Sequence, residues 1–211
     1  MILNTSNISA KFFFTNTAKK NTIFKERKEV LLDIANAVAE ESKSKKFVNL
    51  NFICKHNARS SQLCQAWSFL ASLTFNLQIN SYSGGSEITS FHRNTIKVLQ
   101  KCGFNFQLED FSHQNPKYNI SYDDGKKTFL GFSKYFEDAT NQEPFIGINI
   151  SKNLNDQFTS IQGATHTYHL PYFDLKNIDG TVNQEQKYAA VNEQIASEIY
   201  FLFSTIKGKV S

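Results

Sequence analysis

The stretch VNLNFICKHNARSSQLCQAWSFLASL, residues 48–73, decides the fold. Its first five residues alternate between apolar side chains and asparagine, which is the period of two typical of a β-strand. Its last part places Leu63, Ala66, Trp67 and Leu70 at helical spacing. The residues CKHNARS between the two parts leave room for a tight loop. The sequence therefore predicts a strand, a loop and a helix, with Cys54 at the end of the strand.

Strands and helices alternate along the rest of the chain. Such alternation predicts a parallel sheet covered on both sides, because the connecting helices pack on the faces of the sheet. We expect an α/β fold, a three-layer sandwich with a central parallel sheet of about four strands. The expected elements are a helix over residues 22–42, a strand over 77–85, a helix from about 92 to 102, a strand over 145–150 and a helix over about 182–206.

Two regions depart from this alternation. The segments FNFQL, YNISY and KTFLGF between residues 104 and 135 predict a β-hairpin insertion, with Asp124 and Gly125 as its turn signal. Residues 1–21 are rich in Asn, Thr and Lys around one FFF cluster and predict a loosely ordered arm that packs at one point. The expected organisation is an N-terminal arm and helix, residues 1–45, packed on a domain of residues 46–208.

The composition restricts the partners and the compartment. The net charge of +4 is compatible with an anionic substrate but is too small to indicate nucleic-acid binding. The cysteines Cys54, Cys64 and Cys102 form no zinc or disulfide pattern, which favours a reducing compartment. The N-terminus is a poor signal peptide, and no apolar stretch approaches the ~20 residues that span a bilayer. We therefore expect a cytoplasmic protein without a membrane or nucleic-acid partner.

Cys54 is the first candidate for chemistry. Backbone N–H groups that converge at a helix N-terminus stabilise a thiolate and lower a cysteine pKa to roughly 3.5–7.5. The same N–H groups bind a tetrahedral oxyanion. The alternative is a buried cysteine that only fills the core, and position alone favours neither interpretation for Cys54. Cys64, within a helix, and Cys102, near the end of one, fit the core interpretation.

Three segments resemble the low-molecular-weight protein tyrosine phosphatase and arsenate reductase superfamily. FICKHNARSSQLCQAW (residues 52–67) resembles its phosphate loop, in which a strand ends in Cys and five residues precede Arg and Ser. YSGGSEITSFHRNTIKVLQKCGF (82–104) resembles a segment reading SGGTEATAFNP…GF, and LPYFDLKNIDGT (170–181) resembles YxDPKxxDGT. The three segments occur in the family order, so the resemblance extends over residues 47–206.

The resemblance implies a cysteine-dependent phosphatase that hydrolyses aryl phosphates such as phosphotyrosine. It implies that Cys54 attacks phosphorus to form a phosphocysteine and that Asp174 protonates the leaving group. It also implies that Ser61 hydrogen-bonds the thiolate and that Asn57 holds a strained loop conformation that asparagine tolerates. Asp179, before a glycine, is interpreted as a structural turn residue. The implied phosphate-binding loop comprises Lys55, His56, Asn57, Ala58, Arg59, Ser60 and Ser61.

One departure concerns the arginine that clamps the phosphate in this family. Counting from Cys54 places Ser60 at that position, and Arg59 is one residue early. Serine cannot replace a guanidinium that binds two phosphate oxygens. Two arginines remain candidates, Arg59 if the loop turns it toward the anion and Arg93 if it reaches across. A pseudoenzyme that binds oxyanions without turnover is therefore the alternative to a phosphatase.

A second departure concerns arsenate reduction. Thioredoxin-coupled arsenate reductases carry two relay cysteines after the strand that corresponds to residues 145–150, where this chain has Ser151 and Phe158. Arsenate reduction would therefore need an external thiol. Under each interpretation the partner is a phosphate- or arsenate-type oxyanion, or a phosphorylated small molecule or protein, and no cofactor is needed. His166 and His169 form an HxxH pattern without a third ligand, so we expect no metal site.

Four further residues have two interpretations each. Tyr172 is either an aromatic wall for a phosphoaryl substrate or part of the core. His56 either tunes the thiolate or lies at the rim of the loop. Lys55 and Lys134 either raise the local potential or are solvated, and solvation is the interpretation we favour.

Overall fold

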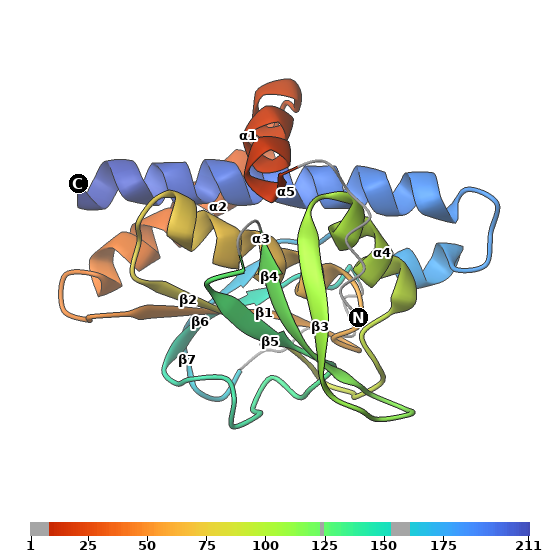
Figure 1. The fold of residues 1–211 in the computed structure, drawn as a ribbon. Helices are drawn as coiled ribbons and strands as arrows, with labels where there is room; N and C mark the ends of the chain where they lie inside the picture. The colour runs from red at the N-terminus through yellow and green to blue at the C-terminus, as the bar shows by residue number, and fades with distance from the viewer. Residues whose placement is uncertain (1–8, 123–124, 153–160) are drawn as a thin grey trace.

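A four-stranded parallel sheet forms the centre of the protein, in the order β2-β1-β6-β7. The computed structural model describes residues 9–122, 125–152 and 161–211. Strand β1 comprises Val48–Cys54, β2 Ile79–Gly85, β6 Phe145–Asn149 and β7 Ala164–His169. Strand β1 pairs in parallel with both β2 and β6, and β7 pairs with β6. The expected α/β fold with a parallel sheet of four strands is confirmed (Figure 1).

Strand β7 is the strand that the sequence analysis missed. Its sequence, ATHTYH, is mostly polar, and it lies at the edge of the sheet with most of its side chains exposed. An edge strand can form without a continuous apolar run, because its outer side faces solvent. Hydrophobic periodicity therefore does not distinguish β7 from a polar loop.

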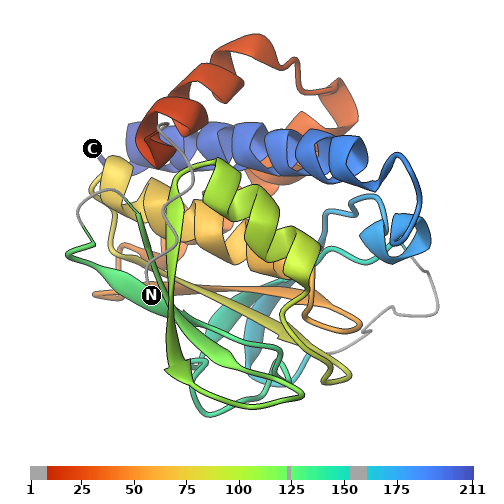
Figure 2. The same ribbon diagram turned by 45° about the vertical axis from the view of Figure 1, so that its right-hand side comes forward.

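The helices lie on one side of the parallel sheet (Figures 1 and 2), whereas the expected three-layer sandwich has helices on both faces. The segment after β5 forms no helix, and it contributes Phe136 to the opposite face instead. Helix α3 (Ser60–Thr74) packs on β1 and β2, and α5 (Gln184–Val210) packs across α3. Helices α2 (Lys25–Glu41) and α4 (Arg93–Lys101) both contact α5. On the opposite face of the sheet, Ile53 packs with Phe145 and Ile161 in a smaller cluster. Among the described helices, none is long and apolar enough to cross a membrane.

The segment after α4 forms a second, antiparallel sheet. Strands β3 (Phe104–Asp110), β4 (Lys117–Tyr122) and β5 (Thr128–Gly131) pair in chain order, so the expected hairpin insertion is confirmed. Asp124 of the expected turn lies outside the described residues, and Gly125 has a φ of +71°. The ring of Phe129 lies 4.9 Å from that of Phe69, measured between centroids, which joins β5 to α3.

The N-terminal segment forms a helix, α1 (Ala10–Lys20), where a loosely ordered arm was expected. Ala10, Phe14 and Thr17 have helical spacing and are buried. The Phe14 ring stacks on Trp67 of α3 at 5.6 Å and meets Tyr200 of α5 edge-on at 5.2 Å, both measured between centroids. The FFF cluster is thus the expected packing point. The helix around it escaped prediction because its flanks of Asn, Thr and Lys show little apolar periodicity.

An ion pair connects α2, α5 and the segment that precedes Asp174. Nε of Arg27 lies 2.5 Å from Oε1 of Glu198, and Nη2 lies 2.7 Å from Oε2. Nη1 of Arg27 donates to the carbonyl of Pro171 at 2.8 Å, and the Tyr172 hydroxyl donates to Glu198 at 2.7 Å. The Glu198 side chain is only 3% exposed, so its charge depends on these donors.

Replacing Arg27 by Met should strongly destabilise the protein, because the Glu198 carboxylate would remain buried without its cation. Breaking a buried pair in this way typically costs roughly 3–5 kcal/mol. We expect a lower midpoint of urea unfolding, followed by far-UV circular dichroism. Arg27→Met/Glu198→Gln should recover much of the loss, and Arg93→Met, at an exposed position, should leave the midpoint unchanged. Equal midpoints for Arg27→Met and Arg93→Met would contradict this role.

Candidate active site at the end of strand β1

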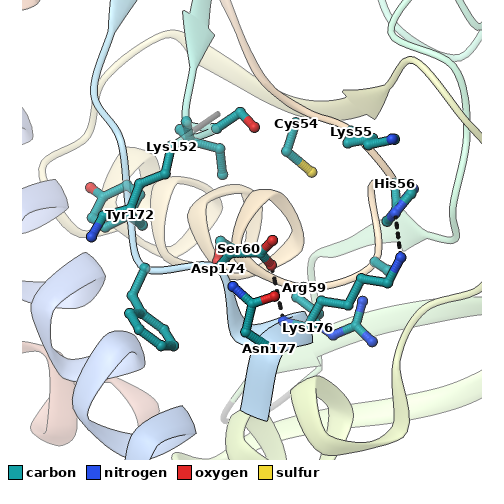
Figure 3. A pocket seen from close by; sticks show the side chains of 14 residues that line it. Cys54, Lys55, His56, Arg59, Ser60, Lys152, Tyr172, Asp174, Lys176 and Asn177 are labelled. Atoms are coloured by element: carbon teal, nitrogen blue, oxygen red, sulfur yellow. Dashed lines mark hydrogen bonds between the residues drawn. The ribbon is translucent and has the colours of Figure 1, made fainter. Parts of the chain in front are cut away.

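Cys54 lies where the sequence predicts it, at the carboxyl end of a central parallel strand. It is the last residue of β1, and α3 begins at Ser60. A pocket of about 400 Å³ opens over this point. The pocket brings together residues of the loop and residues that follow β6 and β7 (Figure 3). Its lining includes Cys54, Lys55, His56, Ala58, Arg59, Ser60, Lys152, Tyr172, Asp174, Lys176 and Asn177.

The loop between β1 and α3 directs its carbonyl groups outward. Every carbonyl group from Cys54 to Ala58 accepts a hydrogen bond from outside the loop. The donors come from the segments that follow β2 and β5 and from α3. The backbone N–H groups of Asn57, His56 and Ser61 meanwhile face the Cys54 sulfur and stabilise its thiolate. Such a nest of N–H groups at a helix N-terminus binds anions.

Gly85 allows the loop to pass close to strand β2. It is the residue of β2 that pairs with Cys54. A Cβ atom at position 85 would lie 2.7 Å from the carbonyl oxygen of Lys55 and 2.9 Å from the backbone nitrogen of Asn57. Both atoms belong to the backbone, so a side chain here would displace the loop around Cys54.

Asn57 and Ser61 are arranged as the resemblance implies. Asn57 has a φ of +46°, in the left-handed region that asparagine tolerates. Its Nδ2 donates to Oγ of Ser61 at 2.9 Å, and its Oδ1 accepts from the backbone N–H of Lys134 at 3.1 Å. Oγ of Ser61 lies 3.1 Å from Sγ of Cys54. Asn57 and Ser61 are fully buried, so they fix the shape of the loop from behind.

The thiol of Cys54 differs from the expectation of a lowered pKa. Burial raises the pKa of Cys54 above its ordinary value. The hydrogen bonds from the Ser61 hydroxyl and from the N–H groups of Asn57 and His56 oppose this effect only in part. The physical reason is that the amides and the hydroxyl supply only partial charges, which stabilise a thiolate less than a neighbouring cation does.

Arg59 is directed at Asp179, whereas the sequence analysis considered that it turns toward the anion. Its Nε lies 2.9 Å from Oδ2 of Asp179 and 3.0 Å from the Tyr188 hydroxyl, and its Nη2 also pairs with Asp179. The Tyr188 hydroxyl donates to Oδ1 of Asp179 at 2.8 Å, and Nε2 of His92 lies 3.5 Å from Oδ2. A partly buried carboxylate thus engages the guanidinium. Asp179 stands at the end of the short helix over Leu175–Ile178, directly before Gly180.

Neither Ser60 nor Arg93 places a guanidinium in the pocket. Ser60 is the first residue of α3 and lines the pocket. Arg93 is exposed at the start of α4 and is not among the described residues that line the pocket, so it does not reach across. Tyr172 fits both of its interpretations, because it lines the pocket while its hydroxyl is buried against Glu198.

Asp174 faces the pocket opposite the loop (Figure 3). It precedes the short 3-10 helix η2 (Leu175–Ile178), and its Oδ1 accepts from the backbone N–H of Lys176 at 3.0 Å. Its neighbour Leu175, which stands where proline is usual in the resembled segment, is buried and anchors the turn. The structure therefore brings Cys54 and Asp174 to one pocket from segments far apart in the sequence.

Sequence reasoning missed two lysines of the pocket. Nζ of Lys176 lies 3.2 Å from Nε2 of His56, and Nζ of Lys152 lies 5.7 Å from the centre of the Phe173 ring. Lys176 stands two residues after Asp174 in the quoted segment 170–181, so a signal for it was present. Lys152 follows β6 outside any motif.

The remaining basic candidates lie in different surroundings. The Lys55 side chain is about half exposed, which agrees with a solvated lysine, and its Nζ lies 3.4 Å from Oε1 of Glu87. Lys134 is buried, contrary to expectation, and its Nζ donates to Oγ1 of Thr140 at 3.0 Å. Burial lowers the pKa of Lys134 to about 8. His166 and His169 lie on the edge strand β7. Among the residues that the structure describes, no group of three or more His, Cys, Asp or Glu side chains could hold a metal.

Comparisons with known proteins find similarity in structure. No protein-family model and no curated protein matches the chain by sequence. A YwlE mutant from Bacillus subtilis superposes with a TM-score of 0.51 at 12% identity, covering 76% of this chain and 99% of that chain. The thioredoxin-dependent arsenate reductase Cg_ArsC1' from Corynebacterium glutamicum gives 0.45 at 17% identity, with coverages of 94% and 84%. A low-molecular-weight protein tyrosine phosphatase from T. tengcongensis gives 0.45 at 15% identity, with coverages of 74% and 98%.

At these identities the likeness concerns the fold. The chain therefore has a fold like that of the YwlE structure from Bacillus subtilis.

Proposed function

We propose that this protein is a cysteine-dependent phosphomonoesterase that acts on aryl phosphates such as phosphotyrosine. The observation that carries the proposal is that Cys54, in a loop whose N–H groups face its sulfur, shares a pocket with Asp174. The charge of the pocket lining supports an anionic substrate, since basic side chains outnumber acidic ones there. The aromatic rings of Tyr172 and Phe173 offer an apolar wall for an aryl group.

The proposed reaction has two steps. First, the Cys54 thiolate attacks phosphorus, the P–O bond to the leaving group breaks, and protonated Asp174 gives its proton to the departing oxygen. Second, water attacks the phosphocysteine, Asp174 takes a proton from that water, and the S–P bond breaks to release phosphate and the thiolate. The N–H groups of the loop stabilise the phosphoryl oxygens in both steps.

Two features of the site limit the rate of the first step. The raised pKa of Cys54 leaves little thiolate at neutral pH. Ser60 carries no charge, and Arg59 is engaged by Asp179, so the charge that develops on the transferring group meets amides and lysines instead of a guanidinium. We therefore expect slow turnover.

Binding of an oxyanion without turnover is the second candidate function. The pairing of Arg59 with Asp179 favours it, because the arginine of the loop then binds a carboxylate and does not stabilise the transition state. The loop N–H groups suffice for binding phosphate or arsenate, which have the same shape and charge.

Arsenate reduction would need an external thiol. Cys64 and Cys102 are buried in the core, and Ser151 follows the strand where a relay cysteine was considered. Phe158, the other relay position, lies outside the described residues. The described cysteines therefore offer no exposed relay for a thiolate at Cys54.

Hydrolysis of p-nitrophenyl phosphate separates the two candidate functions. We expect slow, saturable release of p-nitrophenol by the wild type and none by Cys54→Ser, which cannot form a thiolate. Asp174→Asn should lower kcat more for phenyl phosphate than for p-nitrophenyl phosphate, because the poorer leaving group needs the proton more. A wild type that is as inactive as Cys54→Ser, yet binds phosphate, would contradict the proposed hydrolysis and support oxyanion binding without turnover.

Ser60→Arg should raise kcat for p-nitrophenyl phosphate by about a hundredfold or more, since removing one transition-state donor typically costs that much. The substitution places a guanidinium at the first residue of α3, on the wall of the pocket. Ser60→Gln is the matched control, because it adds length without charge. Equal rates for Ser60→Arg and Ser60→Gln would show that charge at position 60 is not what limits turnover.

Alkylation of Cys54 by iodoacetamide should reveal its raised pKa. The thiolate is the reactive form, so the rate should rise with pH and reach half of its maximum only above the ordinary pKa of a thiol. Ser60→Arg should move this profile down by about 1 to 3 pH, the usual effect of a nearby opposite charge. Mass spectrometry of the modified peptide identifies Cys54, while Cys64 and Cys102 stay buried and unmodified. A profile centred well below the ordinary pKa in the wild type would contradict this description.

A further inference from the structure

The basic side chains of the pocket differ in how their charge is neutralised. Arg59 is paired with Asp179, and Nζ of Lys55 lies 3.4 Å from a carboxylate oxygen of Glu87. Lys176 contacts an imidazole instead, with Nζ 3.2 Å from a ring nitrogen of His56. An imidazole that carries no charge accepts a hydrogen bond from an ammonium group without cancelling its charge.

His56 is suited to hold Lys176 in this way. Its Nδ1 lies 3.1 Å from Oε2 of Glu87, and its Nε2 faces Lys176. Burial lowers the pKa of His56, and the charge of Lys176 lowers it further, so the ring is neutral at pH 7. A neutral ring whose proton is on Nδ1 presents the lone pair of Nε2 to the ammonium.

The backbone also fixes the position of Lys176 relative to Asp174. Its N–H donates to Asp174 at 3.0 Å, so the lysine and the carboxylate belong to one turn, opposite the loop. In Figure 3 the Lys176 side chain extends from this turn toward His56. The Lys176 side chain thus reaches from this turn to His56 of the loop, within the pocket that Cys54 also lines.

We propose that Lys176 binds an oxygen of the phosphate group from across the pocket, and that it supplies the full positive charge that position 60 lacks. The ligand class is a phosphate dianion, free or as a monoester. An ammonium is a point charge without the forked geometry of a guanidinium, so it strengthens binding of a dianion more than it orients one. The inference rests on the proposed function only in that the loop binds a phosphate oxyanion.

Protection of Cys54 from iodoacetamide by inorganic phosphate tests the proposal without requiring turnover. The quantity measured is the phosphate concentration that halves the alkylation rate of each variant. Lys176→Met should raise this concentration about tenfold or more, because a charge-assisted contact to the anion is lost. Lys176→Arg should stay within a few-fold of the wild type.

Lys187→Met is the matched control. Lys187 lies on α5 with Nζ 4.4 Å from the centre of the Phe173 ring, beside the pocket but not among its described lining residues. The Lys187→Met variant loses the same charge as Lys176→Met, so it measures the effect of net charge alone. We expect the phosphate concentration that halves its alkylation rate to equal that of the wild type. Far-UV circular dichroism verifies that both variants are folded.

The outcomes distinguish this inference from the proposed function. Half-protection at the same phosphate concentration in Lys176→Met and wild type overturns the role of Lys176, whether or not the protein hydrolyses phosphate esters. An equal loss in Lys187→Met and Lys176→Met overturns it too, since a diffuse field would then explain both. A tenfold loss confined to Lys176→Met supports it even if p-nitrophenyl phosphate is not turned over, in which case only the proposed hydrolysis fails.

Discussion

Every carbonyl group from Cys54 to Ala58 is hydrogen-bonded away from the sulfur, and much of the structure serves this one constraint. Outward carbonyls leave the N–H groups facing inward, which is what an anion or a thiolate requires. The constraint explains why Asn57 has a positive φ, why a glycine stands at position 85, and why the segment after β5 returns to the loop. The loop is therefore built by its neighbours as much as by its own sequence.

Shape and charge are separable in this site. Hydrogen bonds such as that from Asn57 to Ser61 hold the loop in shape. The guanidinium of the loop, on Arg59, is paired with Asp179. Burial then raises the pKa of Cys54, because partial charges alone do not offset desolvation. A fold can thus keep an anion-binding geometry while the full charges around it are redistributed among other side chains.

Local patterns predicted most of the fold and part of the site. The alternation before Cys54 and the apolar spacing after it were sufficient for β1 and α3, and they placed the cysteine at the strand end. Strand β7 and helix α1 lack such patterns, because one is a polar edge strand and the other buries only a narrow face. The direction of the Arg59 side chain could not be predicted from the sequence for a different reason. Its partner Asp179 lies 120 residues away, and only tertiary packing brings the two together.

The surroundings of Trp67 have a consequence for spectroscopy. It is the only tryptophan of the chain, and its indole is stacked on Phe14 of α1, meets Phe104 of β3 edge-on, and donates from Nε1 to Asn192 of α5 at 2.8 Å. A buried indole emits at shorter wavelength than one in water. The tryptophan fluorescence of this protein therefore comes from a single known place, on the helix that begins after the Cys54 loop. Without any added dye, it reports whether α1 and the antiparallel sheet remain docked there.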